Sequence, residues 1–137
     1  MAGYSGTPLV KKLGIKSGHR IAFVRAPKNY AATLGKLPPE VSVSRAPNGT
    51  MDLIQIFARD RAELESELPR AQGTLAQDGM IWISWPKQAS GIATDLNENS
   101  IRDLALANGL VDVKVCAVDD TWSGLKLVYR LRDRQKK

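Results

Sequence analysis

The sequence is poor in the residues from which metal centres and disulfides are built. Its 137 residues include one cysteine, Cys116, and one histidine, His19. A single cysteine excludes an internal disulfide, and no CxxC or HxxxH spacing indicates a zinc site. A lone cysteine is typical of the reducing cytoplasm, where we expect this protein to work. Because Cys116 lies in an apolar alternation, we expect it to be inert packing and not a nucleophile.

Long apolar runs are also missing. The longest, Met80–Trp85, is interrupted by Ser84 and is far too short to cross a bilayer. Residues 1–18 are rich in glycine and lysine and contain no apolar segment like that of a secretory signal. We therefore expect no association with a membrane.

The common motifs of nucleotide binding and hydrolysis are absent as well. No GxxxxGK[ST] or GxGxxG follows an apolar segment, and GxSxG does not occur. One histidine is too few to specify a Ser-His-Asp triad. We therefore expect no catalytic residue, no metal and no bound cofactor.

What is present is the composition of an ordinary soluble domain, with 43% hydrophobic and 25% charged residues. The length predicts a single domain over residues 1–132. Residues 133–137 form a basic tail that we expect to be disordered. The formal net charge of +6 favours anionic partners, although part of it belongs to this tail and the residues before it.

Apolar segments alternate with amphipathic stretches, which predicts an α/β sheet covered on both faces. The last two strands are joined by a connection too short for a helical crossover, so we expect a C-terminal antiparallel hairpin after a mostly parallel sheet. We predict strands at residues 20–25, 41–45, 51–58, 80–85, 111–118 and 125–131, and helices at 8–13, 29–37, 61–78 and from Thr94 or Asp95 to Asn108.

Two of these predictions are more detailed. The first strand is apolar on both faces and is therefore expected inside the sheet, whereas the second alternates and is expected nearer an edge. The third helix, capped by Asp60, has a buried stripe that ends at Leu75, and Pro69 in its middle predicts a kink or two shorter helices.

Basic side chains follow most of the predicted strands. In such sheets, ligands bind beyond the carboxyl ends of the strands, near the point where the strand order reverses. If these side chains converge, they form an anion-attracting rim, supported by helix N-termini at Asp60 and Asp95. The alternative is that each cation pairs with a nearby carboxylate or with water. The basic residues are Arg25, Lys28, Arg45, Arg59 and Lys87.

The loop after Trp85 and the connection between the last two strands complete the predicted site. Ser90 adds a donor, and Trp122 with Ser123 can approach it. Trp85 and Trp122 either wall the ligand or cap the ends of the core, and the second reading is favoured. The pair formed by Asp119 and Asp120 is either a turn signal, which is the commoner role, or a site for a divalent ion. The predicted ligand-binding edge comprises Arg25, Lys28, Arg45, Arg59, Lys87, Ser90, Asp119, Trp122 and Ser123.

Four segments resemble the Rossmann-like S-adenosylmethionine-dependent methyltransferases: residues 13–21, 52–57, 75–79 and 107–110. The resemblance implies a three-layer Rossmann-like sheet. That fold has a Gly-rich turn after its first strand and an acidic residue after its second, which accepts hydrogen bonds from the ribose hydroxyls. Here the turn at residues 25–29 has no glycine, the second strand ends at Arg45, and one helix–strand unit is missing. We therefore expect a truncated methyltransferase-like fold that does not bind this cofactor in the usual manner.

A closer resemblance is to a small bacterial family of uncharacterised proteins. It is similar in residues 3–9, in Trp85–Lys87 with Ala89–Gly91, and in residues 113–119 with 122–126. The family has no established activity that can be transferred.

Three functional hypotheses follow. The leading one is a non-catalytic, methyltransferase-like binding or regulatory domain that recognises an anionic small molecule or protein partner at the carboxyl edge. The alternative is an atypical S-adenosylmethionine- or nucleotide-binding transferase, with Asp119 or Lys87 handling protons. Nucleic-acid binding through the net charge and the basic tail is the least favoured, because the sequence shows no aromatic-rich basic face. The sequence does not indicate an oligomeric state.

Overall fold

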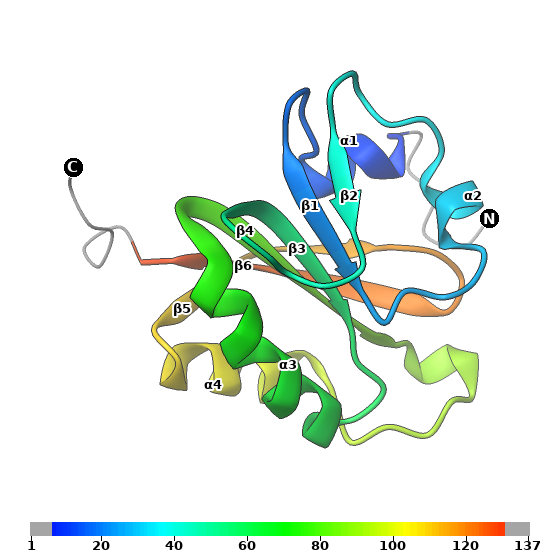
Figure 1. Cartoon of the computed structure of the whole chain (residues 1–137). Helices are drawn as coiled ribbons and strands as arrows, with labels where there is room; N and C mark the ends of the chain where they lie inside the picture. Colours follow the sequence, from blue (N-terminus) through cyan, green and yellow to red (C-terminus); the bar gives the residue numbers. More distant parts are fainter. Residues whose placement is uncertain (1–6, 131–137) are drawn as a thin grey trace.

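A six-stranded mixed sheet forms the middle layer of the protein, and the computed structural model describes the chain over residues 7–130 (Figure 1). The strand order is β2-β1-β3-β4-β6-β5. The strands are β1 (Arg20–Val24), β2 (Ser42–Ser44), β3 (Met51–Phe57), β4 (Leu75–Pro86), β5 (Leu110–Ala117) and β6 (Trp122–Tyr129).

The pairing confirms the predicted topology. Strands β2, β1, β3 and β4 pair in parallel, and β6 lies antiparallel between β4 and β5. The first strand is inside the sheet and the second is at its edge, as the apolar patterns predicted. The fold is thus an α/β, Rossmann-like sheet that is mostly parallel, with an antiparallel C-terminal pair.

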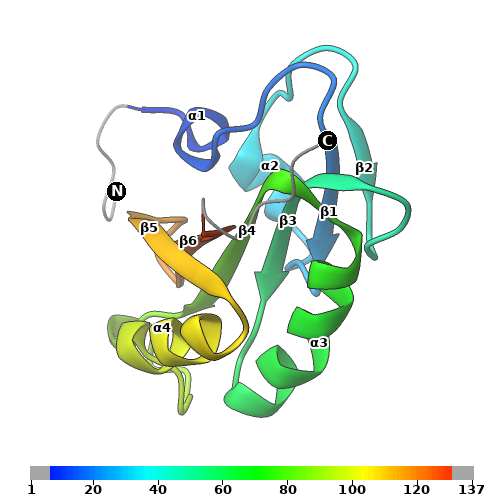
Figure 2. The same cartoon turned by 90° about the vertical axis from the view of Figure 1, so that its left-hand side faces the viewer.

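Helices cover the two faces of this sheet unequally. The longer helices α3 (Arg61–Thr74) and α4 (Glu98–Ala107) lie together on one face, as Figures 1 and 2 show. The other face carries α1 (Leu9–Leu13) and α2 (Tyr30–Leu34), which have five residues each. No helix within residues 7–130 has the length and apolar character needed to cross a bilayer.

Each face has its own hydrophobic core. Under α3 and α4, the alternate strand residues Ile54, Ile56, Ile81 and Ile83 pack against helix residues such as Leu64. The opposite core contains Leu53, Phe57 and Trp82 with Leu13 and Tyr30. There the indole Nε1 of Trp82 donates to the Leu13 carbonyl at 2.8 Å, which fixes the end of α1 on the sheet.

The structure corrects two predicted details of α3. It is one helix across Pro69 and not two shorter helices, and Pro69 is exposed, so that water can satisfy the carbonyl that lacks its amide partner. Leu75 does not belong to the helical stripe, because it opens β4 and pairs with Met51. The register then shifts between Met51 and Leu53, and Gly79, which directly follows the predicted helical residues 61–78, lies in this irregular part of β4.

The start of α4 was also predicted wrongly. Neither Thr94 nor Asp95 caps it. Asn97 does, since its side chain accepts from the Ser100 amide at 2.8 Å while Ser100 Oγ accepts from the Asn97 amide at 3.0 Å. This reciprocal capping box satisfies two backbone amides at once.

Candidate functional site: a cavity at the carboxyl ends of β1 and β2

A cavity of about 580 Å³ lies where β1 and β2 end and α2 begins. This volume is in the range of small-molecule sites in proteins. The cavity lies beyond the carboxyl ends of the parallel strands β1 and β2. The strand order reverses next to it, between β1 and β3. Ligands of open α/β sheets bind beyond the carboxyl ends of the strands, near such a reversal.

The lining of this cavity combines cations with apolar walls. Arg25, Lys28 and Arg45 line it, and none of its lining residues is acidic. The apolar walls come from Phe23, Leu34, Leu37 and Val43. Val43 stands out among them, because it is 50% exposed although it is a large aliphatic side chain.

Arg25 is bound to α3. Its Nε lies 3.0 Å from Glu67 Oε2, and its Nη1 lies 3.5 Å from Glu63 Oε2. For this residue, pairing with carboxylates was therefore the correct alternative. In contrast, neither Lys28 nor Arg45 forms an ion pair with any other residue of the described part of the chain.

The backbone at Arg25 adopts the left-handed conformation, with φ at 59°. Such a conformation costs a non-glycine residue on the order of 1–3 kcal/mol and persists only where its surroundings hold it. The side chain of Arg25 is held at this turn by its two ion pairs with α3. The turn after β1 thus has the backbone shape that favours glycine, although no glycine is present.

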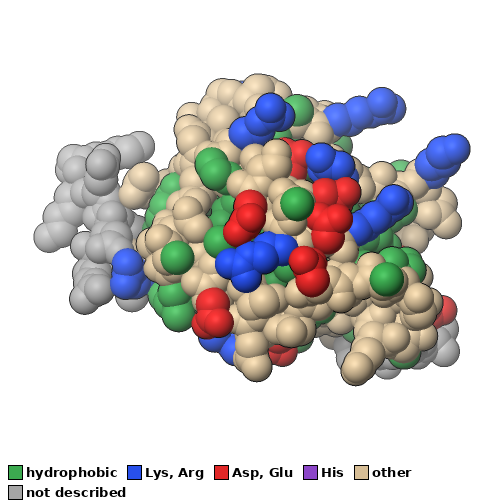
Figure 3. Space-filling view, turned by 90° about the horizontal axis from the view of Figure 1, so that it is seen from below, with side chains coloured by type: hydrophobic (Ala, Val, Ile, Leu, Met, Phe, Trp, Pro, Cys, Tyr) green, Lys and Arg blue, Asp and Glu red, His purple; other side chains and the backbone are tan. Residues whose placement is uncertain are grey.

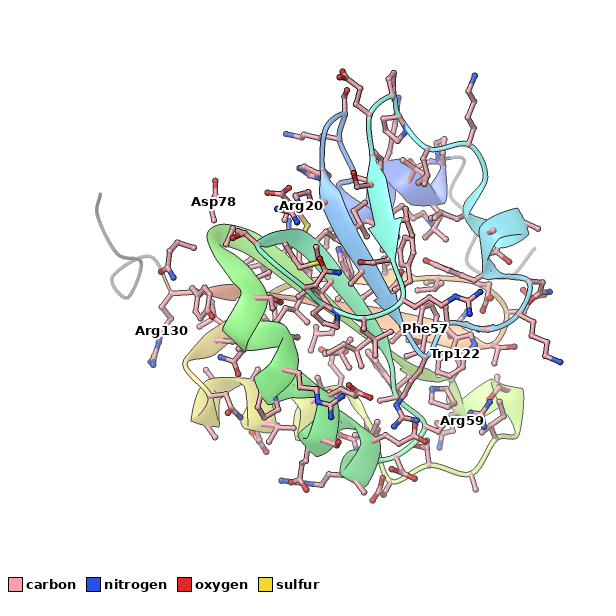
Figure 4. All side chains as sticks on the ribbon, viewed as in Figure 1. Arg20, Phe57, Arg59, Asp78, Trp122 and Arg130 are labelled. Atoms are coloured by element: carbon pink, nitrogen blue, oxygen red, sulfur yellow. The ribbon has the colours of Figure 1, made fainter. Side chains whose placement is uncertain are left out.

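Arg59 and Lys87 do not line the cavity, so the structure brings together three of the five predicted cations. The Arg59 amide donates to Glu63 Oε1 at 2.9 Å, and the Lys87 amide donates to the Thr121 carbonyl at 2.7 Å. Figure 4 shows Arg59 below Phe57 and Trp122, where β3 runs out. Seen from the side of α3 and α4, acidic and basic side chains are intermixed (Figure 3).

The helix N-termini do not support an anion, contrary to the prediction. Asp60 Oδ1 accepts from the Glu63 amide at 2.9 Å, and Asp95 Oδ1 accepts from the Arg61 amide at 2.8 Å. Two carboxylates of the chain itself therefore occupy the start of α3. The start of α4 is closed by its capping box. The backbone amides at these two helix starts therefore already have acceptors, and two carboxylates already lie at the positive end of the α3 dipole.

Ser90, Asp119, Trp122 and Ser123 have local structural contacts and lie outside the lining of the cavity. Ser90 Oγ donates to the Lys87 carbonyl at 2.7 Å, within a 3₁₀ turn over Gln88–Ser90. Asp119 Oδ1 accepts from the Thr121 and Trp122 amides at 2.8 Å each, which makes Asp119 a turn residue. Residues 7–130 hold no group of three or more potential metal ligands.

Both tryptophans of the predicted site cap the core, which was the favoured reading. Trp85 is 8% exposed and Trp122 is 7% exposed. The ring of Trp122 meets Phe57 edge-on with centroids 5.2 Å apart. Ser123 lies within the sheet, opposite Trp85 and Ala117.

Sequence reasoning missed a buried polar row beneath the cavity. The Tyr30 hydroxyl donates to Gln55 Oε1 at 2.6 Å, and Gln55 Nε2 donates to Ser84 Oγ at 2.9 Å. Gln55 and Ser84 are fully buried. Burial raises the pKa of the Tyr30 hydroxyl well above its ordinary value. The signal in the sequence was a polar residue inside each of two apolar runs.

Tyr30 links this row to the cavity. Its ring meets Phe23 and Phe57 edge-on, with centroids 5.4 and 4.7 Å apart, and the same residue lines the cavity. The aromatic contacts and the hydrogen bond to Gln55 together fix its position. Tyr30 therefore forms a floor of the cavity that contacts both β1 and β3.

A further cavity of about 540 Å³ lies behind the loop that follows β4. Gln88, Thr94 and Asn97 line it together with Trp85 and Ile92. Charged side chains are absent from its lining, so its character differs from that of the cavity at β1 and β2.

Solved structures with similar backbones are methyltransferases at low sequence identity. The ribosomal protein L11 methylase from Lactobacillus delbrueckii subsp. bulgaricus has a TM-score of 0.60 and 13% identity, over 89% of this chain and 75% of that one. The DhpI–SAH complex has a TM-score of 0.59 and 10% identity, over 91% and 83% of the two chains. Magnesium protoporphyrin IX methyltransferase from Synechocystis PCC 6803 with bound SAM has a TM-score of 0.57 and 10% identity, over 89% of this chain and 74% of that one. These likenesses show the fold.

The residues of the cavity do not fit S-adenosylmethionine, which the fold implies. Recognition of the ribose hydroxyls requires acceptors, but the cavity has no acidic lining residue and Arg45 stands at the end of β2. The carboxylates next to Arg25 are already engaged by its guanidinium. The cofactor also carries a sulfonium cation, which Lys28 and Arg45, the two cations of the cavity without an ion pair in the described chain, repel, although they suit its carboxylate.

No curated protein sequence matches the chain. A family model described as "Protein of unknown function (DUF3052)" matches residues 42–131, which is more than half of its length. The match begins at β2 and includes β3, β4 and the antiparallel pair of β5 and β6, whereas β1 precedes it. The chain belongs to the DUF3052 family of proteins of unknown function and has a methyltransferase-like fold.

Proposed function

We propose that this protein is a non-catalytic, methyltransferase-like binding domain that recognises an anionic ligand in the cavity at the ends of β1 and β2. One observation carries the proposal. Lys28 and Arg45 line that cavity without a carboxylate partner in the described chain, and no lining residue is acidic. A cytoplasmic location is part of the proposal, because the chain has a single cysteine.

The chemistry of these side chains favours a carboxylate or a phosphate. The planar guanidinium of Arg45 can donate two parallel hydrogen bonds to such a group, and the Lys28 ammonium adds a point charge. The apolar walls around Leu37 and Val43 remain for the body of the ligand. Arg25 is a weaker contributor, since a ligand has to compete with Glu63 and Glu67 for it.

The absence of catalysis is inferred from the groups that line the cavity. Its lining residues include no histidine, cysteine or carboxylate to transfer a proton near neutral pH. The Tyr30 hydroxyl donates to Gln55, and its raised pKa keeps it protonated there. A ligand in this cavity is therefore held without a general base beside it.

Calorimetric titration and thermal shift test this proposal with inorganic phosphate, pyrophosphate and citrate as probes. At least one probe should bind and raise Tm in a saturable way. A ligand whose free concentration is 100 times its Kd stabilises the folded state by about 2.7 kcal/mol. The double variant Lys28→Ala/Arg45→Ala should lose the effect. The matched control is Arg70→Ala, an exposed cation on α3. Arg59→Ala/Lys87→Ala tests whether the site extends to the other strand ends.

The alternative is an atypical S-adenosylmethionine- or nucleotide-binding transferase. One observation favours it: the turn after β1 takes a left-handed conformation at Arg25, and apolar walls suited to a base lie beside it. The same thermal-shift panel separates the two functions when S-adenosylmethionine, S-adenosylhomocysteine and ATP are included. A saturable rise with S-adenosylmethionine and none with phosphate would favour the transferase.

A further inference from the structure

Strand β5 is an edge of the sheet that no described strand covers. It is the last strand in the sheet order, and Figure 2 shows it at the border of the sheet. Val113 and Val115 in its middle are 53% and 49% exposed. An edge strand presents a row of backbone donors and acceptors to which another strand can pair. With exposed aliphatic side chains as well, this edge is suited to receive one.

The opposite face of the same edge carries a lysine cluster, which we define as Lys16, Lys114 and Lys126. Lys114 and Lys126 are direct partners in the register of β5 and β6. Desolvation lowers the pKa of Lys126, and the charges of Lys114 and Lys16 lower it further. None of the three forms an ion pair with a carboxylate of residues 7–130.

This arrangement costs stability. Like charges directly opposite each other on paired strands are destabilising. Lys114 stays close to α1, where its Nζ reaches the Lys12 carbonyl at 3.5 Å. A group of cations without carboxylate partners in the described chain, next to an unpaired strand edge, is complementary in charge to an anionic occupant.

We propose that the β5 edge binds an extended acidic segment of a partner protein, which adds to the sheet as its next strand. Successive side chains of a strand point to opposite faces. The segment therefore alternates β-branched residues, which pack on Val113 and Val115, with Asp or Glu, which face the lysine cluster. Main-chain hydrogen bonds supply affinity, and the alternation supplies specificity. This edge lies at the far end of the sheet from β2 and is independent of the cavity.

Two other occupants fit the surface less well. If a second copy of the chain paired through β5, the lysine clusters of the two copies would lie close together and repel each other. A nucleic acid complements the charge, but the exposed centre of the edge is aliphatic, without the aromatic side chains on which bases stack. Charge and apolar character together favour an acidic protein segment.

Synthetic peptides test the proposal. The probe alternates Glu and Val over eight residues, the length of β5, and carries a fluorescent dye. We expect saturable binding by anisotropy and slowed hydrogen exchange at the amides of residues 111–117. A peptide of the same composition with its Glu and Val residues in two blocks should bind about tenfold more weakly, because its charges fall on both faces.

Variants identify the surface. Lys114→Glu should weaken the alternating Glu–Val peptide about tenfold and should bind an alternating Lys–Val peptide better than the original chain does. Lys11→Glu is the matched control, because Lys11 is an exposed lysine of α1 outside the cluster. Lys126→Gln provides a second variant in case Lys114→Glu folds poorly, which circular dichroism will show.

Four results would overturn the proposal. The first is equal affinity of Lys114→Glu and Lys11→Glu for the alternating Glu–Val peptide, and the second is binding of this peptide without slowed hydrogen exchange in β5. The third is a dimer in light scattering whose interface slows hydrogen exchange in β5. The fourth is binding of polyuridine RNA through the same lysines that is tighter than binding of the peptide. The last two assign the edge to a second copy or to nucleic acid.

Discussion

Tyr30 joins the cavity to the core through a single side chain. Its ring forms part of the cavity wall, and its hydroxyl begins the buried row that runs through Gln55 to Ser84. Buried polar side chains of this kind stabilise only while every member has a partner. In residues 7–130 no buried side-chain nitrogen or oxygen lacks one. The shape of the cavity floor therefore depends on an intact row.

Replacing Gln55 by Leu tests this dependence. The substitution removes the acceptor of the buried Tyr30 hydroxyl, and an unsatisfied buried group costs about 1–3 kcal/mol. We expect the free energy of unfolding in urea to fall by about 2 kcal/mol. The control Gln88→Leu, at an exposed position of the 3₁₀ turn, should change it little. Equal losses in both variants would show that the row does not stabilise the fold.

The raised pKa of the Tyr30 hydroxyl predicts a loss of stability in alkali. The unfolded chain releases this proton near pH 10, whereas the folded chain retains it. The stabilisation is therefore present below pH 10, declines as pH rises further and is lost above the folded pKa. Tyr30→Phe should show a shallower decline of the free energy of unfolding above that pH. Identical slopes in the two proteins would contradict this account.

At the residue scale, the sequence predicted positions better than partners. Arg25, Lys28 and Arg45 were expected at one edge because parallel strands end at the same edge of a sheet. That expectation needs only the order of strands and turns. The ion pairs of Arg25 depend on where α3 lies relative to β1, which no local pattern encodes. Whether any of the predicted residues binds a ligand stays a prediction.

At the scale of elements, β5 and β6 combine a structural cost with an exposed edge. Their register places Lys114 opposite Lys126 on a face that the short helices only partly cover. Burial and neighbouring lysines lower the pKa of Lys126, which means that its charged form is disfavoured in the folded chain. This pair therefore opposes the stability of the sheet.

Replacing Lys126 by Gln should stabilise the protein. The substitution removes a like-charge cross-strand contact, worth about 0.5 kcal/mol. We expect a small rise in Tm and in the free energy of unfolding, larger at low salt, where screening is weakest. Lys36→Gln, at an exposed site beyond α2, should show no such change. A lower free energy of unfolding in Lys126→Gln than in the original chain would refute the repulsion between Lys114 and Lys126.

Local patterns predicted the type of each element better than its ends. The stripe of Leu64, Leu68 and Ala71 has a helical spacing that continues to Leu75, so the apolar spacing alone does not indicate that the helix stops before Leu75. Leu75 is taken into β4 by its pairing with Met51, which is a long-range contact. Asp95 resembles a cap in the sequence but serves α3 instead, since it accepts from the Arg61 amide.

At the scale of the whole molecule, two basic regions lie at opposite ends of one sheet. The cavity is at the ends of β1 and β2, and the lysine cluster is on the β5 side. The net charge of +6 therefore does not describe a single binding face. The fold class and the antiparallel C-terminal pair followed from the alternation of elements and from the short C-terminal connection. The cavity did not, because its walls come from segments that meet only in the folded chain.

The most direct test of this account is calorimetric titration of Lys28→Ala/Arg45→Ala beside Arg70→Ala, with the anion from the phosphate, pyrophosphate and citrate panel that binds the original chain best. Removing two charge-assisted hydrogen bonds should cost about 3 kcal/mol, or about a 100-fold loss of affinity, while Arg70→Ala keeps the original value. Equal affinity in the two variants, or no binding of any of these anions to the original chain, would contradict the assignment of this cavity as an anion site.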